Sequence, residues 1–127
     1  MYTISKQFTF SASHQLLNLP DNHPCYRLHG HNYIVEVELQ SAELDATGFV
    51  RDYNDLDGLK IFINENLDHR HLNEVFGHDD TTAENLASFL YDWSKQQWPE
   101  VTAVRVSETP KTWAEYRPPV QPQVQLI

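Results

Sequence analysis

Three histidines have the spacing of a metal site. His29 and His31 stand two residues apart in a segment of alternating polar and apolar residues, so on a strand both side chains leave the same face. His14 lies near the end of the preceding alternating segment, and a hairpin of the two segments would place it opposite the other pair. Neutral imidazoles on one rigid surface are typical zinc ligands. We therefore predict a Zn²⁺ site on His14, His29 and His31.

The same region allows other interpretations. Two histidines at the end of a strand are often only polar surface, and His23 in the intervening loop is a second candidate ligand. Cys25, in the same loop, could act as a fourth ligand, which would make the zinc structural and leave no open position. A lone cysteine is also commonly a small buried hydrophobe. The residues alone leave these alternatives open.

Two further positions carry carboxylates. Asp68 stands beside His69 and could orient this imidazole for proton transfer, although adjacent residues need not hydrogen-bond and a solvated loop fits equally well. Glu108 ends an otherwise apolar strand face, where a surface strand end is the default interpretation. A carboxylate has two parallel acceptors, so it could also hold the edge of a guanine-like or pterin ring, which offers two parallel N–H donors. Trp113 is expected in the core or in an interface.

The apolar pattern predicts four strands and two helices. Side chains alternate over residues 2–15, 29–44, 101–108 and 113–117, which are the expected strands. One helix starts near residues 52–55 and runs to Leu67, and a second begins at the capping box Thr81–Glu84 and stops before Pro99. The polar residues 68–80 predict a loop. The order ββααββ describes an α+β fold, an antiparallel four-stranded sheet with two helices on one face.

Size, charge and cysteine content narrow the class of protein. The 127 residues fit one domain, placed at residues 1–117, followed by a Pro/Gln-rich tail at 118–127 that is expected to be extended or disordered. Asp and Glu number 18 against 9 Lys and Arg, and the resulting charge of −9 argues against nucleic-acid and membrane partners. The single cysteine and the lack of an apolar signal stretch predict a cytoplasmic protein. The exposed outer strands predict a homo-oligomer.

Several short motifs together resemble the 6-pyruvoyl-tetrahydropterin synthase and 6-carboxy-tetrahydropterin synthase family. They are, in order, Phe10-Ser-Ala-Ser-His14, Cys25-x-x-x-His29-Gly-His31-Asn-Tyr33, Leu67-Asp-His69 with Leu72-Asn73, Thr82-Ala-Glu84-Asn85 and Glu108-Thr109. Their joint order covers nearly the whole predicted domain. The resemblance implies a T-fold (tunnelling fold) subunit that assembles as a homohexamer, a dimer of trimers.

The resemblance also implies a role for each matched residue. Zinc would be held by His14, His29 and His31, the base would be Cys25, the proton-relay pair Asp68 and His69, and the pterin anchor Glu108. The zinc would keep an open position for substrate oxygens. Because this family builds its site between subunits, Cys25 and the relay pair need not belong to the same chain.

The spacing between Cys25 and His29 bears on the reaction. Only three residues separate them, which resembles the bacterial queuosine-pathway members of the family. These zinc-dependent carbon–carbon lyases convert 7,8-dihydroneopterin triphosphate to 6-carboxy-5,6,7,8-tetrahydropterin, acetaldehyde and triphosphate. The alternatives are a pyruvoyl product, with only triphosphate eliminated, or a non-enzymatic zinc- or pterin-binding protein. Lys6, Arg27 and Arg70 are candidates for contact with the triphosphate.

Overall fold

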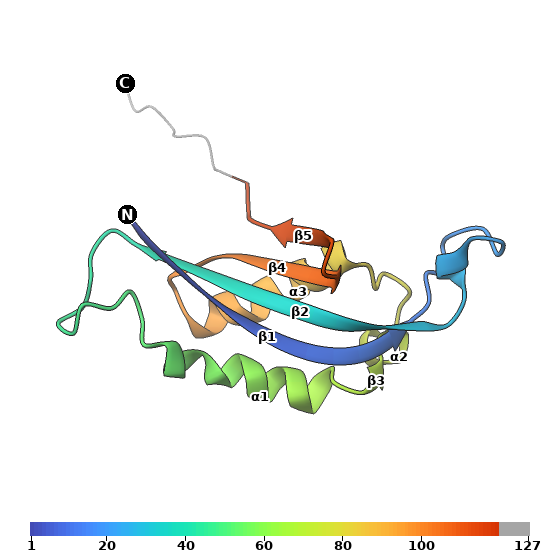
Figure 1. Cartoon of the computed structure of the whole chain (residues 1–127), viewed down its shortest axis with the longest axis horizontal. Helices are drawn as coiled ribbons and strands as arrows, with labels where there is room; N and C mark the ends of the chain where they lie inside the picture. Colours follow the sequence, from blue (N-terminus) through green and yellow to red (C-terminus); the bar gives the residue numbers. More distant parts are fainter. Residues whose placement is uncertain (120–127) are drawn as a thin grey trace, which may run out of the picture.

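A computed structural model of the chain describes residues 1–119 and places helices against one sheet (Figure 1). Within these residues the sheet has five strands in the order β3-β1-β2-β4-β5. The strands are β1 Tyr2–His14, β2 His29–Ser41, β3 Arg70–His71, β4 Val101–Thr109 and β5 Thr112–Tyr116. The helices are the 3-10 turns η1 Pro24–Tyr26 and η2 Tyr53–Leu56, and the α-helices α1 Asp57–Asn66, α2 Leu72–Phe76 and α3 Ala83–Gln97. The α+β class predicted from the sequence is confirmed.

A long hairpin of β1 and β2 forms the centre of the sheet. The two strands pair antiparallel from Tyr2, opposite Ser41, to His14, opposite His29. Alternation sends the apolar side chains of both strands to one face, where they join those of α1 and α3 in a single cluster that includes Phe8, Phe10, Val35, Val37, Leu59, Ile63, Leu86 and Leu90. Burial of each large apolar side chain is worth roughly 1.5–3 kcal/mol. The hairpin is therefore held firmly along its length.

The opposite face of the sheet is polar and carries an ion-pair network. Arg105 contacts Glu38 at 2.7 Å and Glu115 at 2.9 Å, and Arg117 contacts Glu38 at 2.7 Å. Burial alone would raise the pKa of Glu38, but hydrogen bonds from Thr102, Arg105 and Arg117 outweigh it and lower the pKa. The nearly buried carboxylate of Glu38 is thus the centre of this network.

The 3-10 turn η2 and helix α3 begin at capping residues, and the cap of α3 lies one residue later than predicted. The side chain of Asp52 caps η2. Helix α3 begins one residue later than predicted, because Thr82 rather than Thr81 is its N-cap and accepts a hydrogen bond from the Asn85 N–H. Thr81 is instead fully buried and contacts the ring of His14. The buried contact takes Thr81 out of the capping position, and its neighbour caps the helix.

The loop predicted for residues 68–80 contains two short elements, so the prediction of four strands and two helices is wrong at this point. Strand β3 pairs in parallel with Ala12 and Ser13 of β1, and the sheet is therefore not wholly antiparallel. Helix α2 ends at Gly77, whose φ of 69° favours glycine. Both elements are too short to show a period, and α2 is fixed to the core by the fully buried Leu72.

The ends of the chain segments differ slightly from the prediction. The second strand ends at Ser41 rather than at residue 44. The tail predicted for residues 118–127 lies, from residue 120 on, outside the described residues.

Within residues 1–119, no helix has the length and apolar character needed to cross a membrane.

Candidate metal centre and its surroundings

The three predicted histidines converge at one end of the β1–β2 hairpin. His14 ends β1 directly opposite His29, the first residue of β2, and His31 follows on the same face. The ring centroids are 4.5 Å apart for His14 and His29, 5.2 Å for His14 and His31, and 4.9 Å for His29 and His31. Each ring offers one nitrogen, and these three atoms lie within 4.8 Å of one another. The three residues could therefore hold one metal ion.

Hydrogen bonds fix the orientation of two rings. Nδ1 of His14 donates to the carbonyl of Thr81 at 2.8 Å, and Nδ1 of His29 donates to the carbonyl of Arg27 at 2.6 Å. Because a carbonyl only accepts, both Nδ1 atoms carry a proton, which leaves Nε2 as the nitrogen that can bind a metal ion. Nε2 of His14 and Nε2 of His31 are buried and have no hydrogen-bond partner among residues 1–119. Such atoms are rare in proteins, and a metal ion would satisfy them.

Electrostatics favours the neutral rings that metal binding requires. Burial lowers the pKa of His14 and of His31, while the nearby carboxylate of Glu108 acts in the opposite direction. The donor set is three imidazole nitrogens, and Cys25 is not part of this group in the described chain. Three neutral imidazoles fit a divalent ion such as Zn²⁺. The residues present therefore fit the predicted ion.

Glu108 lies beside the histidines, at the end of β4. Its Oε2 is 3.6 Å from Nε2 of His31. Burial, followed by the charge of Glu108, raises the pKa of Tyr33 above its usual range, so the phenol stays protonated. The Tyr33 hydroxyl is buried and, like the two imidazole nitrogens, has no partner in the described part of the chain. Glu108 therefore lies next to at least one of these unpartnered polar atoms, Nε2 of His31.

Glu108 also lines a cavity of about 290 Å³ between the start of α3 and β5. Trp113, which is 45% exposed, lines the same cavity. Sequence reasoning placed Trp113 in the core or an interface and missed this neighbour of Glu108. The one available signal was Pro110, which marks the tight turn that folds β5 back beside β4.

Cys25 lies in η1, within the loop that joins β1 to β2. The residue is half-buried, its N–H donates to Nδ1 of His23 at 3.0 Å, and its carbonyl accepts from the Leu16 N–H at 2.9 Å. His23 is therefore engaged in this turn and is not one of the converging rings. No hydrogen bond within residues 1–119 joins the Cys25 thiol to the three histidines. The structure does not bring Cys25 into contact with the metal group in one chain.

Asp68 and His69 are in contact on the outer edge of β1. Oδ2 of Asp68 is 2.9 Å from Nδ1 of His69, and Oδ1 accepts from the Ser11 N–H at 3.0 Å. The bond from Ser11 and, next, the bond from His69 lower the pKa of Asp68. His69 has a φ of 58°, which is uncommon for a residue other than glycine, and its side chain is 82% exposed. The exposed ring is available to a ligand or to another subunit.

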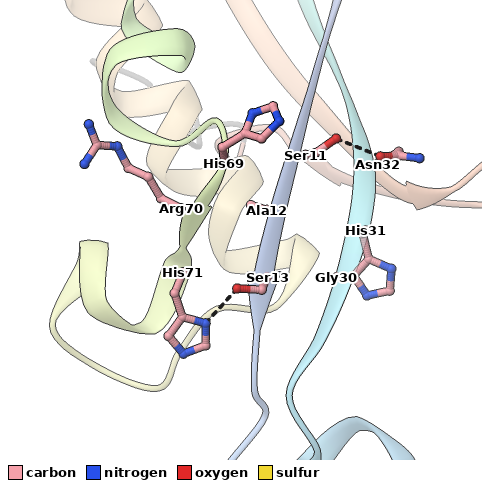
Figure 2. A pocket seen from close by; sticks show the side chains of 9 residues that line it. All are labelled: Ser11, Ala12, Ser13, Gly30, His31, Asn32, His69, Arg70 and His71. Atoms are coloured by element: carbon pink, nitrogen blue, oxygen red, sulfur yellow. Dashed lines mark hydrogen bonds between the residues drawn. The ribbon is translucent and has the colours of Figure 1, made fainter.

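A cavity of about 450 Å³ lies along this edge (Figure 2). Figure 2 shows the ring of His69 at one end and the hydrogen bond between Ser13 and His71 at the other. His31 contributes to its lining, but within the described chain no hydrogen bond joins Asp68 or His69 to the three converging histidines. In a single chain the relay pair and the metal group thus share this cavity through His69 and His31 without a direct hydrogen bond.

Two of the predicted phosphate-binding residues are engaged elsewhere. Lys6 contacts Asp57 at 3.0 Å. It lies about 26 Å from the end of β1, because a strand rises about 3.3 Å per residue. Arg70 donates to a carbonyl of α1 at 2.8 Å, and Figure 2 shows its guanidinium turned away from β1. Arg27 is exposed and stands two residues before His29.

Comparison with known proteins agrees with this geometry. The family model described as 6-pyruvoyl tetrahydropterin synthase matches residues 3–119. The chain is 33% identical over 125 residues to 6-carboxy-5,6,7,8-tetrahydropterin synthase of Synechocystis sp., covering 94% of this chain and 95% of the relative. It is 33% identical over 133 residues to 6-pyruvoyl tetrahydrobiopterin synthase of Drosophila melanogaster, covering 91% and 79%.

A solved structure gives the same result for the fold. The 6-pyruvoyl tetrahydropterin synthase of Caenorhabditis elegans matches with a TM-score of 0.81 at 30% identity, covering 93% of this chain and 96% of that one. The predicted T-fold is confirmed by this likeness, with β3 as an additional short strand.

Proposed function

The chain belongs to the 6-pyruvoyl tetrahydropterin synthase family, and on this basis we propose that it is a zinc-dependent carbon–carbon lyase acting on 7,8-dihydroneopterin triphosphate. The proposed products are 6-carboxy-5,6,7,8-tetrahydropterin, acetaldehyde and triphosphate, in the synthesis of queuosine and related 7-deazapurines. One observation supports the proposal most. Two of the converging histidines have a buried Nε2 without a hydrogen-bond partner in residues 1–119, and that of His31 lies 3.6 Å from Glu108, a carboxylate that can hold a pterin edge.

The metal group and the ring anchor would act side by side. In this proposal His14, His29 and His31 hold Zn²⁺, which when bound supplies a Lewis acid for the hydroxyl groups of the substrate side chain. Glu108 accepts two N–H groups of the pterin ring and so aligns the reacting carbons. The 3.6 Å between Glu108 and His31 supports a substrate that reaches both.

Proton transfer is assigned to the remaining matched residues. Cys25, as a thiolate, removes a carbon-bound proton, and a nearby cation would favour that thiolate. His69 returns a proton to the substrate, and the carboxylate of Asp68 at 2.9 Å orients the ring and stabilises its charged form.

We propose that a second subunit completes the site. In one chain, Asp68 and His69 lie on the outer edge of β1 without a hydrogen bond to the metal group, and the ring of His69 is largely exposed. Within residues 1–119 the sheet ends in β5 on one side, and on the other side β3 covers only two residues of β1. Open strand edges of this kind favour pairing between copies. A homohexamer, built as a dimer of trimers, would bring the pair of one chain to the histidines of the next.

The choice of product depends on the loop that holds Cys25. Relatives named as carboxy and as pyruvoyl synthases match at the same identity, so the comparisons do not separate the two reactions. The short spacing from Cys25 to His29 supports the carboxy product. A cytoplasmic location is supported by the single cysteine, which suits a reducing compartment.

The reaction itself tests the proposal. Purified zinc-loaded protein is incubated with 7,8-dihydroneopterin triphosphate, and acetaldehyde, triphosphate and pterin products are measured. We expect acetaldehyde and triphosphate in equal amounts, together with 6-carboxy-5,6,7,8-tetrahydropterin. Triphosphate without acetaldehyde would favour the pyruvoyl alternative. Pterin binding with no turnover would favour a non-enzymatic binding protein.

A further inference from the structure

We propose that Asn73 is a positioning residue of the metal centre. Its carboxamide holds the end of β1 next to His14 and ties it to the segment that orients the His14 ring. The inference rests on the proposed function only in taking the three histidines as metal ligands. Asn73 lies in the first turn of α2, and its partners are Gln15 and Asp79 rather than any of the three rings.

The outer edge of β1 needs hydrogen-bond partners where the sheet runs out. Strand β3 supplies only two residues. Side chains continue the ladder at both of its ends: Asp68 accepts from the Ser11 N–H at 3.0 Å, and Asn73 takes both backbone groups of Gln15. Gln15 N–H donates to Oδ1 of Asn73 at 2.9 Å, and Nδ2 of Asn73 donates to the Gln15 carbonyl at 2.8 Å. Because a carboxamide has the same donor and acceptor as a peptide group, Asn73 replaces a missing strand residue.

This clamp fixes His14 from both sides. On the inner edge of β1, His14 pairs with His29 of β2. On the outer edge, the residue directly after His14 is held by Asn73. Backbone groups that lose their partners at the end of a strand allow local opening. Loss of the Asn73 clamp would therefore remove the outer restraint next to His14, the last residue of β1, and leave the pairing with His29 as its backbone restraint.

Asn73 also reaches the segment that orients the His14 ring. Nδ2 of Asn73 donates to Oδ1 of Asp79 at 3.1 Å. Asp79 precedes Thr81 by two residues, and the carbonyl of the fully buried Thr81 accepts from Nδ1 of His14 at 2.8 Å. Hydrogen bonds of this kind set the tautomer and the direction of a metal-binding imidazole. One side chain thus joins the restraint on the His14 backbone to the restraint on its ring.

The variant Asn73→Asp tests the proposal. It keeps the shape and the acceptor for Gln15, but it places an oxygen against the Gln15 carbonyl and Asp79. We expect Zn²⁺ affinity, measured by competition with a chelator, to fall about 10–100-fold. We also expect a changed absorption spectrum for the Co²⁺-loaded protein. Asn66→Asp is the matched control, because Asn66 makes a comparable bond to the Phe62 carbonyl at the end of α1, and it should leave affinity and spectrum unchanged.

Melting temperatures separate positioning from a merely structural role. A structural role would lower the melting temperature of the metal-free and zinc-loaded forms equally, whereas a positioning role narrows the gap between them. If Asn73→Asp does not fold, Asp79→Ala removes one arm of the clamp and should narrow the gap partly. Unchanged zinc affinity and spectrum in the folded variant would overturn the proposal. Wild-type protein that binds no zinc would instead refute the metal site itself.

Discussion

His14 is fully buried, whereas His29 and His31 are partly exposed, so substitutions of the three proposed ligands should differ in their effect on the metal-free protein. We expect one zinc per wild-type chain by metal analysis, and loss of zinc in each single alanine variant. Only His14→Ala should also lower stability clearly, by roughly 1–3 kcal/mol, because it leaves buried groups of Thr81 without a partner. Full zinc content in all three variants would remove the assignment.

Substitution of Cys25 distinguishes a catalytic metal site from a structural one. Its sulfur is not part of the group of converging ligands, so Cys25→Ala is expected to keep zinc and fold while losing turnover. Zinc content, circular dichroism and acetaldehyde release from the same preparation provide the measurement. A fourth ligand would behave differently, since metal binding is coupled to folding. Zinc loss together with a lower melting temperature would identify Cys25 as a ligand rather than a base.

The proposed role of Glu108 as ring anchor can be tested with a pterin that lacks the triphosphate. Glu108→Gln keeps the shape of the side chain but sets a donor against a donor of the ring, which costs roughly 1–3 kcal/mol. We expect at least about a tenfold loss of affinity for unphosphorylated 7,8-dihydroneopterin by calorimetric titration, with zinc content unchanged. Equal affinity in wild type and variant would place the ring elsewhere.

At the level of elements, local patterns predicted the long segments and missed the short ones. The alternation of polar and apolar residues shows which side chains of a strand share a face. This was sufficient to predict that His14 lies opposite His29 in the hairpin. Strand β3 and helix α2 have two and five residues, and long-range contacts fix them. Glu108 and Trp113 line one cavity because β5 folds back beside β4, and composition does not reveal this.

The N-cap of α3 at Thr82 is expected to contribute to the stability of the protein. Thr82 caps the helix, so Thr82→Ala should destabilise the protein by about 0.5–2 kcal/mol in urea unfolding. Thr82→Ser keeps the hydroxyl and serves as the control with a much smaller effect. If Thr82→Ala and Thr82→Ser had the same stability, the cap at Thr82 would contribute nothing.

For the whole molecule, the ion-pair network on the polar face predicts the response to acid. Because the folded protein lowers the pKa of Glu38, the network contributes stability above the ordinary carboxyl pKa near 4.5 and loses it as the pH falls through the lowered value. Glu38→Gln should cost roughly 1–3 kcal/mol at pH 7, and this difference should shrink below about pH 4.5. Urea unfolding of both proteins across pH provides the measurement, and a difference that grows in acid would contradict it.

The position of the histidines along the chain has a consequence for the order of folding. All three belong to one hairpin. His14 is oriented by Asn73 and Thr81, which come from much later in the sequence. The loop that an ion closes between His14 and His29 is short, so little chain entropy is lost when it forms. Ion binding could therefore nucleate the pairing of β1 with β2 early, and the arrival of α2 and α3 would then convert a loose chelate in a nascent hairpin into the rigid site of the native protein.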